Sequence, residues 1–375
     1  MSEIKVNTIV DASGGNTASI NGQTPTVSNM AGRNRIINGD MRIDQRNAGA
    51  SVSVDGSLAY PVDRFFVQDS TDGAFTAEQV EDAPTGFYQS LKVTVTTADA
   101  SLGATQYSRI VQYIEGNNVA DFGLGTVGAS TFTISFWTKS SLTGTFGGAV
   151  GNSADNRMYP FTYTISAANT WEQKTVTIAG DTTGTWLKTN GIGLSVMWGL
   201  GVGSTYSGTA GAWAGSTYLS ATGSTSVVGT SGATFYITGV QLEAGSVATP
   251  FENVDYSEML SRCQRYFCKT YDINIPPGDT ALGGWNGAIR STVPTTNSYQ
   301  SIGNWSFPVS MRAAPTVVAY NPRTGVTNSF VGDGSDYSPV GIGNPGNRGC
   351  NFFANGVSVG THVFVQVAAT ASAEL

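Results

Sequence analysis

The stretch GVQLEAGSVATPFENVDYSEMLSRCQRYFCKTY, residues 239–271, decides how the chain is divided. It begins as the end of an apolar strand, passes a turn, and continues through an irregular segment into the clearest helical pattern of the sequence. Asp255 suits the N-cap of this helix because its carboxylate can accept a backbone hydrogen bond, and Glu258 follows at capping-box spacing. We therefore interpret residues 253–271 as a helix that links two larger modules.

The composition indicates an all-β protein whose solvent faces carry hydroxyls and amides rather than charges. Charged residues make up 12% of the 375-residue chain, against about 25% in typical soluble domains. The 17 Phe, 15 Tyr and 7 Trp residues supply enough large side chains for more than one core. The net charge of −7 argues against nucleic acid as a partner, because phosphate binding needs a basic surface. No apolar run reaches the length of about 18 residues that membrane insertion requires.

The regions on either side of the helix are predicted to be β-rich. Residues 1–32 carry few large apolar side chains and are expected to form an arm that is ordered only in an assembly. Residues 33–252 contain about eight to ten alternating, aromatic strand segments, which predict a jelly-roll β-sandwich. Near its start, Asn38-Gly39 is a turn signal between two short predicted strands. Residues 272–375 resume the β pattern and predict a second, smaller β-sandwich.

Catalytic residues are not predicted. His362 is the only histidine, and its place in a strand-like segment favours a structural role over that of a catalytic base. The three cysteines, Cys263, Cys268 and Cys350, follow no zinc spacing and no disulfide framework, which favours synthesis in a reducing cytoplasm. Glycoside hydrolysis would need only two carboxylates, but no candidate acid is paired with an aromatic cleft in the sequence.

No cofactor is predicted, although two turns could hold a structural calcium ion, whose preferred ligands are carboxylate and carbonyl oxygens. Asp69 and Asp72 lie in one of these turns, and Asp333 and Asp336 lie in the other. An ordinary turn is the favoured interpretation of both, because the remaining ligand positions of a calcium loop are missing.

Aromatic residues in loops are the predicted ligand-binding residues. A sugar stacks its apolar face on a ring and is oriented by a few polar side chains. Residues 199–232 are too long and too rich in Gly and Ser for an ordinary connection, and long loops are where a β scaffold presents a binding surface. Any single aromatic ring in such a loop could instead belong to a core or to a subunit contact. The candidates are Tyr206, Trp213 and Tyr218 in this loop, and Trp285, Tyr299, Trp305, Tyr320 and Tyr337 in the C-terminal module.

Several motifs occur in a characteristic order along the chain. They are RIINGDMRIDQRNAG (35–49), YPVDRFFV (60–67), GVQLEAGSVATPFE (239–252), CQRYF (263–267) and FPVSMRAAPTV (307–317). This succession resembles bacteriophage tail-fibre and receptor-binding proteins, many of which carry a carbohydrate-binding-module-like jelly roll. The organisation matches over about residues 33–270.

The resemblance implies a homotrimeric virion tail fibre, made in the host cytoplasm, whose N-terminal arm attaches to phage tail or other virion proteins. The expected function is attachment to the host cell surface, by binding a surface glycan, with residues 272–375 as the receptor-binding tip. A purely structural fibre or adaptor protein is the alternative, and a polysaccharide depolymerase is the second alternative.

The linking helix provides the expected trimer contact. Leu260, Cys263 and Phe267 recur at spacings of three and four residues, so one face of the predicted helix is apolar. A helix this short is not stable in isolation, so this face must be buried. Three copies around a fibre axis would bury it, which makes Leu260, Cys263 and Phe267 the predicted contact. For Cys263 alone, a small buried side chain is the simpler interpretation.

Overall fold

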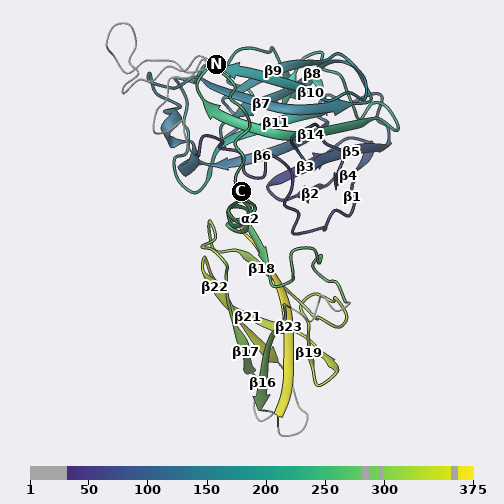
Figure 1. Cartoon of the computed structure of the whole chain (residues 1–375), viewed down its shortest axis with the longest axis vertical. Helices are drawn as coiled ribbons and strands as arrows, with labels where there is room; N and C mark the ends of the chain where they lie inside the picture. Colours follow the sequence, from purple (N-terminus) through teal and green to yellow (C-terminus); the bar gives the residue numbers. More distant parts are fainter. Residues whose placement is uncertain (1–31, 281–286, 295–298, 356–361) are drawn as a thin grey trace, which may run out of the picture.

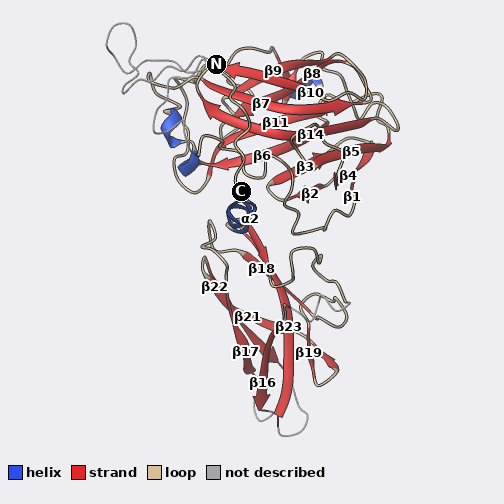
Figure 2. Cartoon of the chain, in the orientation of Figure 1, coloured by secondary structure: helices blue, strands red, loops and turns tan. Residues whose placement is uncertain are grey.

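The computed structural model describes residues 32–280, 287–294, 299–355 and 362–375. It is nearly all β, which confirms the predicted fold class, and Figure 2 shows strands in both the larger and the smaller module. The helix α2 lies where the two modules meet (Figure 1). In the part of the chain that the structure describes, no helix is long and apolar enough to cross a membrane.

The larger module is a sandwich of two six-stranded antiparallel sheets, in the orders β1-β4-β5-β14-β7-β10 and β2-β3-β6-β11-β8-β9. We call these the first and second sheets. The strand bounds are β1 (Val52–Val54), β2 (Leu58–Val62), β3 (Phe65–Asp69), β4 (Ala74–Val80), β5 (Ser90–Thr97), β6 (Tyr107–Glu115), β7 (Phe132–Ser140), β8 (Gly144–Gly151), β9 (Met158–Ile165), β10 (Glu172–Ile178), β11 (Ile192–Val202) and β14 (Thr234–Ala244).

The core of the sandwich follows from the period-2 alternation of these strands. Phe132, Ile134 and Phe136 of β7 are fully buried, because successive side chains of a strand point to opposite faces and these three share the inner one. Trp198 of β11 comes from the other sheet and meets Phe136 edge-on, with 5.5 Å between the ring centroids. Such interlocked rings fill the space between the two sheets.

The long connection between β11 and β14 is packed against the outer surface of the second sheet. It contains the 3-10 turn η3 (Ser204–Tyr206) and two short strands, β12 (Ser207–Gly208) and β13 (Ser220–Ala221). Gly147 of β8 permits this close approach: a Cβ at Gly147 would lie 2.2 Å from the hydroxyl oxygen of Ser224. The connection therefore covers only part of the sheet, over β8, β9 and β11.

The predicted strands around Asn38-Gly39 are wrong, although the turn itself is present. The Asn38 side chain donates to the carbonyl oxygens of Ile43 and Asp63, each at 2.9 Å, and accepts from the Ile43 amide at 2.9 Å. These bonds satisfy backbone groups that a strand partner would otherwise satisfy. Residues 33–49 consequently run as an irregular, largely buried segment between the sandwich and α2.

The smaller module has two sheets around its own core. The larger sheet joins β15 (Phe267–Lys269), β16 (Ile289–Pro294), β18 (Thr316–Tyr320) and β19 (Phe330–Gly332) to β23 (His362–Ser372), and adds β20 (Ser335–Tyr337) beside β19. The smaller sheet contains β17 (Tyr299–Ser306), β22 (Gly349–Asn355) and β21 (Val340–Gly346). Phe330 and Phe352 are fully buried between them.

The linking helix is shorter than predicted. α2 spans Tyr256–Gln264, and Asp255 is its N-cap, as predicted, with Oδ1 accepting from the Ser257 amide at 2.8 Å. Phe267 belongs instead to β15, which pairs with β23 as the first strand of the smaller module. Phe267 adopts a strand rather than a helical conformation because its backbone gains sheet hydrogen bonds from Ser372, more than 100 residues away.

The apolar face of α2 is buried within the chain itself. Cys263 is fully buried and Phe267 is 6% exposed, and the cluster around the helix includes Ile37, Ile43 and Tyr266. The expectation that Cys263 and Phe267 form a trimer contact is therefore corrected, because intrachain packing leaves these side chains almost no surface for another copy. Leu260 is half-buried, and its part in a trimer stays a prediction.

Candidate functional site

The outer face of strand β6 carries aromatic and polar side chains of the kind that the sequence analysis predicts in loops. Ile110 and Ile114 point into the sandwich core, so Tyr107, Arg109 and Tyr113 point outward by alternation. They lie on the part of the second sheet nearest β3 and β2, beside the area that the long connection covers.

Five half-buried tyrosines gather on this surface, which we call the tyrosine face: Tyr60, Tyr107, Tyr113, Tyr206 and Tyr218. Phe66 of β3 is buried beneath it, with ring centroids 5.1 Å from Tyr113 and 5.7 Å from Tyr60. Tyr206 meets Tyr107 edge-on at 5.6 Å. The rings are held by neighbours on a sheet, so they form a fixed aromatic surface rather than a flexible one.

Polar groups are set among these rings. The guanidinium of Arg109 donates to Gln68 Oε1 from Nε at 3.2 Å and from Nη2 at 2.8 Å, and its carbon lies 5.0 Å from the Tyr107 ring centroid. Burial raises the pKa of the nearby Asp155 carboxyl, and the charge of Arg109 opposes this shift. Rings interleaved with oriented planar polar groups are the combination that a sugar requires.

The structure brings two of the predicted ligand-binding residues together, since Tyr206 and Tyr218 both lie on the tyrosine face. Trp213, from the same loop, has a structural position instead. Its ring lies between Tyr159 and Trp186, with centroids 5.3 Å and 5.4 Å away, and its Nε1 donates to a backbone carbonyl at 2.7 Å.

The candidates in the smaller module are packed inward where the structure describes them. Trp305 is 8% exposed and meets Phe307 edge-on at 4.9 Å, so its prediction as a ligand platform is wrong. Tyr337 stacks on Phe330 at 5.4 Å, and both Tyr337 and Tyr320 are half-buried. Trp285 lies outside the described residues, as do the side chains of Tyr299 and His362.

The four aspartates considered for calcium are placed as follows. Asp69 is buried and accepts from Thr71 Oγ1 at 2.8 Å, whereas Asp72 is exposed. Asp333 accepts from a backbone amide at 3.0 Å, and Asp336 pairs with an arginine. Within the described ranges, no group of three or more His, Cys, Asp or Glu side chains could hold a metal ion. A calcium ion held mainly by carbonyl oxygens stays a prediction.

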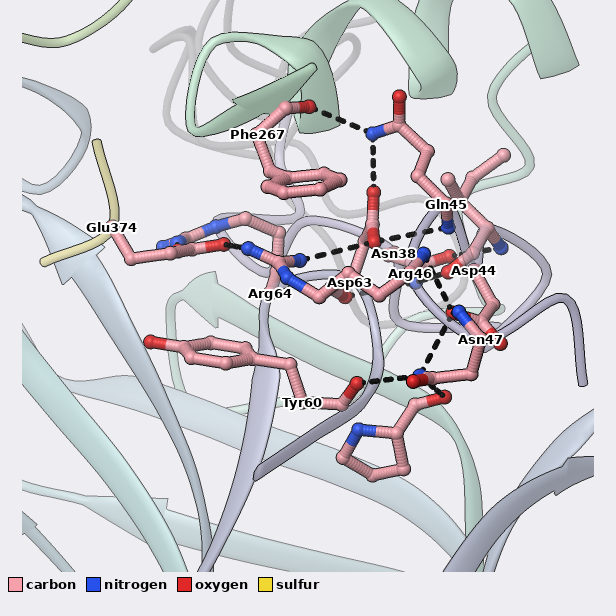
Figure 3. A network of polar contacts seen from close by, with 12 residues as sticks. Asn38, Asp44, Gln45, Arg46, Asn47, Tyr60, Asp63, Arg64, Phe267 and Glu374 are labelled. Atoms are coloured by element: carbon pink, nitrogen blue, oxygen red, sulfur yellow. Dashed lines mark hydrogen bonds and ion pairs between the residues drawn. The ribbon is translucent and has the colours of Figure 1, made fainter. Parts of the chain in front are cut away.

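One end of the tyrosine face meets a buried polar network between the two modules (Figure 3). Arg64 is 2% exposed and pairs with Glu374, which lies 310 residues away near the end of the chain. Arg46 bridges Glu374 at 3.0 Å and Asp63 at 3.2 Å. Burial raises the pKa of the fully enclosed Asp63 carboxyl to about 6. The network joins residues of the larger module to the last residues of the smaller one.

Rings cover the cations of this junction. The Arg46 guanidinium lies 3.8 Å from the ring centroid of Phe267 and 4.5 Å from that of Tyr60, a residue of the tyrosine face. The Arg64 guanidinium lies 3.5 Å from the Tyr266 ring. These contacts fix Tyr60 and the smaller module to one another.

Sequence reasoning missed Tyr60, Arg109 and Tyr113 as site residues. The signal was present in YSRIVQYIE (107–115), where Tyr107, Arg109 and Tyr113 stand at odd positions, and Ile110 and Ile114 stand at even ones. Alternation predicts that such residues share one face of a strand, but it does not reveal whether that face is covered.

The two-sheet sandwich defines the class of the larger module as an all-β sandwich with an aromatic outer face. No protein-family model matches the chain, and no curated protein sequence matches it. Solved structures with a similar course include the enzymatically active domain of bacteriophage CBA120 tailspike protein 4, at 13% identity and a TM-score of 0.29. That match covers 56% of this chain and 21% of the tailspike chain, so the matched part spans about a fifth of that protein.

Two carbohydrate-binding modules are also among the similar structures. A protein described as CBM4 shows 15% identity and a TM-score of 0.27, covering 56% of this chain and 98% of that one. A family 11 carbohydrate-binding module from Clostridium thermocellum shows 10% identity and a TM-score of 0.27, covering 53% and 98%. Likenesses of this strength assign no function, and the functional inference rests on the site itself.

Proposed function

We propose that this protein is a non-enzymatic virion fibre protein that attaches to the host cell surface by binding a glycan on the tyrosine face. The carrying observation is the set of five half-buried tyrosines around Arg109 and Gln68 on an outer sheet surface. The resemblance of the chain's motifs to phage tail-fibre proteins supports the fibre role, and the charge-poor β composition agrees with it.

Binding would use stacking for affinity and hydrogen bonds for orientation. The apolar face of a pyranose ring lies on Tyr107 or Tyr113, while the buried Arg109 stays bonded to Gln68 and Asp155 offers an acceptor to the hydroxyls at the ring edge. Because Phe66 and Gln68 already hold these side chains, little conformational freedom is lost when the sugar binds.

Glycan recognition then belongs to the larger module and not, as the sequence predicts, to residues 272–375. Trp305 of β17 belongs to the core of the smaller module, and Tyr337 of β20 packs against that core. The smaller module then acts as a support that is fixed to the sandwich through Glu374 and Arg64. Attachment to the virion through residues 1–32 and assembly as a homotrimer remain parts of the proposal.

The test is a glycan array on the purified protein, followed by titration of the best ligand. Tyr107→Ala and Tyr113→Ala should each weaken binding by about tenfold, since a stacking ring contributes about 1–1.5 kcal/mol. Tyr88→Ala is the matched control: Tyr88 is 65% exposed and bonds Glu81 away from the tyrosine face. Equal losses in all three variants would refute the placement of the site.

Two other outcomes would favour other functions. A wild-type protein that binds no glycan on a broad array, yet is essential for particle assembly, would be a purely structural fibre or adaptor. Release of reducing ends from host envelope polysaccharide would identify a depolymerase.

A further inference from the structure

A cavity of about 280 Å³ lies where the described chain begins, between residues 32–37, the 3-10 turn η1 (Gly116–Asn118) and helix α2. Three of the residues that line this cavity are arginines, and no lining residue is acidic. The lining residues are Gly32, Asn34, Arg35, Ile37, Asn118, Arg262 and Arg265. The cavity is separate from the tyrosine face, with which it shares no residue.

Two of the arginines are oriented by exposed carboxylates that do not line the cavity. Arg35 Nη2 lies 2.7 Å from Asp121 Oδ2, and Arg262 Nη2 lies 2.6 Å from Glu258 Oε1. The side chains of Asp121 and Glu258 are 49% and 57% exposed, so solvent screens their charges. These pairs therefore hold each guanidinium group in place through one nitrogen, Nη2.

The third arginine completes the cationic wall. Arg265 donates to both oxygens of the buried Glu115 carboxylate, from Nε at 3.0 Å and from Nη2 at 2.6 Å. It is consequently rigid, and it contributes shape and a fixed dipole more than free charge. The Nε of Arg35 is buried and has no hydrogen-bond partner among the described residues, which leaves a donor that a ligand could satisfy.

We propose that this arginine cavity is a binding site for an oxyanion, namely a carboxylate, phosphate or sulfate group. Guanidinium groups match the planar geometry of such groups and donate charge-assisted hydrogen bonds to them. The cavity volume is severalfold larger than the about 30 Å³ that one water molecule occupies in the liquid. The cavity therefore has room for the charged group and for part of the ligand that carries it.

The identity of the larger ligand rests on the proposed function. If the protein binds a host glycan, the cavity would take the acidic group of a charged surface polysaccharide. A free inorganic anion has the same chemistry, and the two sources are separated in the experiment below.

The test is calorimetric titration of the full chain with inorganic sulfate and phosphate, at constant ionic strength balanced by chloride, since salt screens such contacts. Arg262→Gln should weaken sulfate binding by about tenfold, the loss of one charge-assisted hydrogen bond. Arg323→Gln is the control, because Arg323 is also paired with an exposed carboxylate but belongs to the smaller module.

A second pair of variants uses the exposed Asn118, whose replacement does not disturb the core. Asn118→Asp brings a negative charge to the cavity and should abolish sulfate binding, whereas Asn118→Ala should retain it. The site is refuted if sulfate and phosphate do not bind the wild type, or if Arg262→Gln and Asn118→Asp bind them as the wild type does.

The glycan arm compares a uronic-acid oligosaccharide with its neutral counterpart. Preference for the acidic sugar that disappears in Asn118→Asp would identify a glycan as the ligand; equal binding of both sugars would refute the glycan assignment and leave the inorganic anion. Tyr107→Ala should bind sulfate as the wild type does, so failure of the tyrosine face and failure of the arginine cavity give different results.

Discussion

The aromatic residues of the larger and the smaller module have opposite roles, although they look alike in the sequence. Tyr206 and Tyr218 lie on the outside of a sheet whose inner face is already filled with other rings. Trp305 and Tyr337 pack into the core of a much smaller module, Tyr337 directly on Phe330. A small module has a high ratio of surface to volume and needs its large side chains inside. A loop aromatic is therefore a binding candidate only where another core has been completed without it.

The largest effect is expected from separating the two modules. Arg64→Ala removes an almost fully enclosed cation and leaves the Glu374 carboxylate, whose side chain is 9% exposed, with Arg46 as its remaining partner. Breaking a buried ion pair from one side costs about 3–5 kcal/mol, so the free energy of unfolding should fall by about that amount in urea. Arg323→Ala, which breaks an exposed pair with Asp336, should cost less than about 1 kcal/mol. Similar losses in the two variants would show that the junction does not stabilise the chain.

The next effect tests the contrast between the two sets of rings directly. Trp305→Ala should lower the free energy of unfolding by about 3 kcal/mol or more, because it leaves a cavity in the smaller core. Tyr107→Ala removes a half-buried ring and should cost about 1 kcal/mol, while it weakens glycan binding. Thermal unfolding and glycan titration of the two variants check this contrast. If Trp305→Ala lost the ligand and Tyr107→Ala kept it, the assignment of Trp305 to the core and of Tyr107 to the binding surface would be wrong.

The smallest effect concerns pH. Burial raises the pKa of Asp63 from 3.8 to about 6, so the folded protein holds this proton more tightly than the unfolded chain. The stability that this group contributes therefore falls as the pH rises from about 4 to about 6. In Asp63→Asn this part of the pH dependence should vanish, a change of at most about 1 kcal/mol per pH unit.

Asp336→Asn serves as the control for this measurement. The hydrogen bond from Arg323 lowers the pKa of Asp336, so its contribution is lost as the pH falls below about 4, the opposite direction. Unfolding curves from pH 4 to pH 7 that keep the same slope in Asp63→Asn and in the wild type would contradict the prediction for Asp63.

Local patterns predicted much of the fold correctly. The alternation of Phe132, Ile134 and Phe136 and the N-cap at Asp255 depend on neighbouring residues, and both are present. Phe267 shows the limit of this reasoning. Its spacing from Cys263 continues the helical pattern, but pairing with Ser372 turns it into a strand. A contact between residues so distant in sequence leaves no trace in local periodicity.

The sequence by itself determined which side chains share a face. Alternation in a pleated strand obliges Tyr107, Arg109 and Tyr113 to point the same way, whatever surrounds them. Only the tertiary structure decided that this way is outward, and that the long connection from β11 brings Tyr206 and Tyr218 to the same surface. It also decided that Arg262 and Arg35 face one cavity, since side chains so far apart along the chain meet only through the packing of α2 on the sandwich.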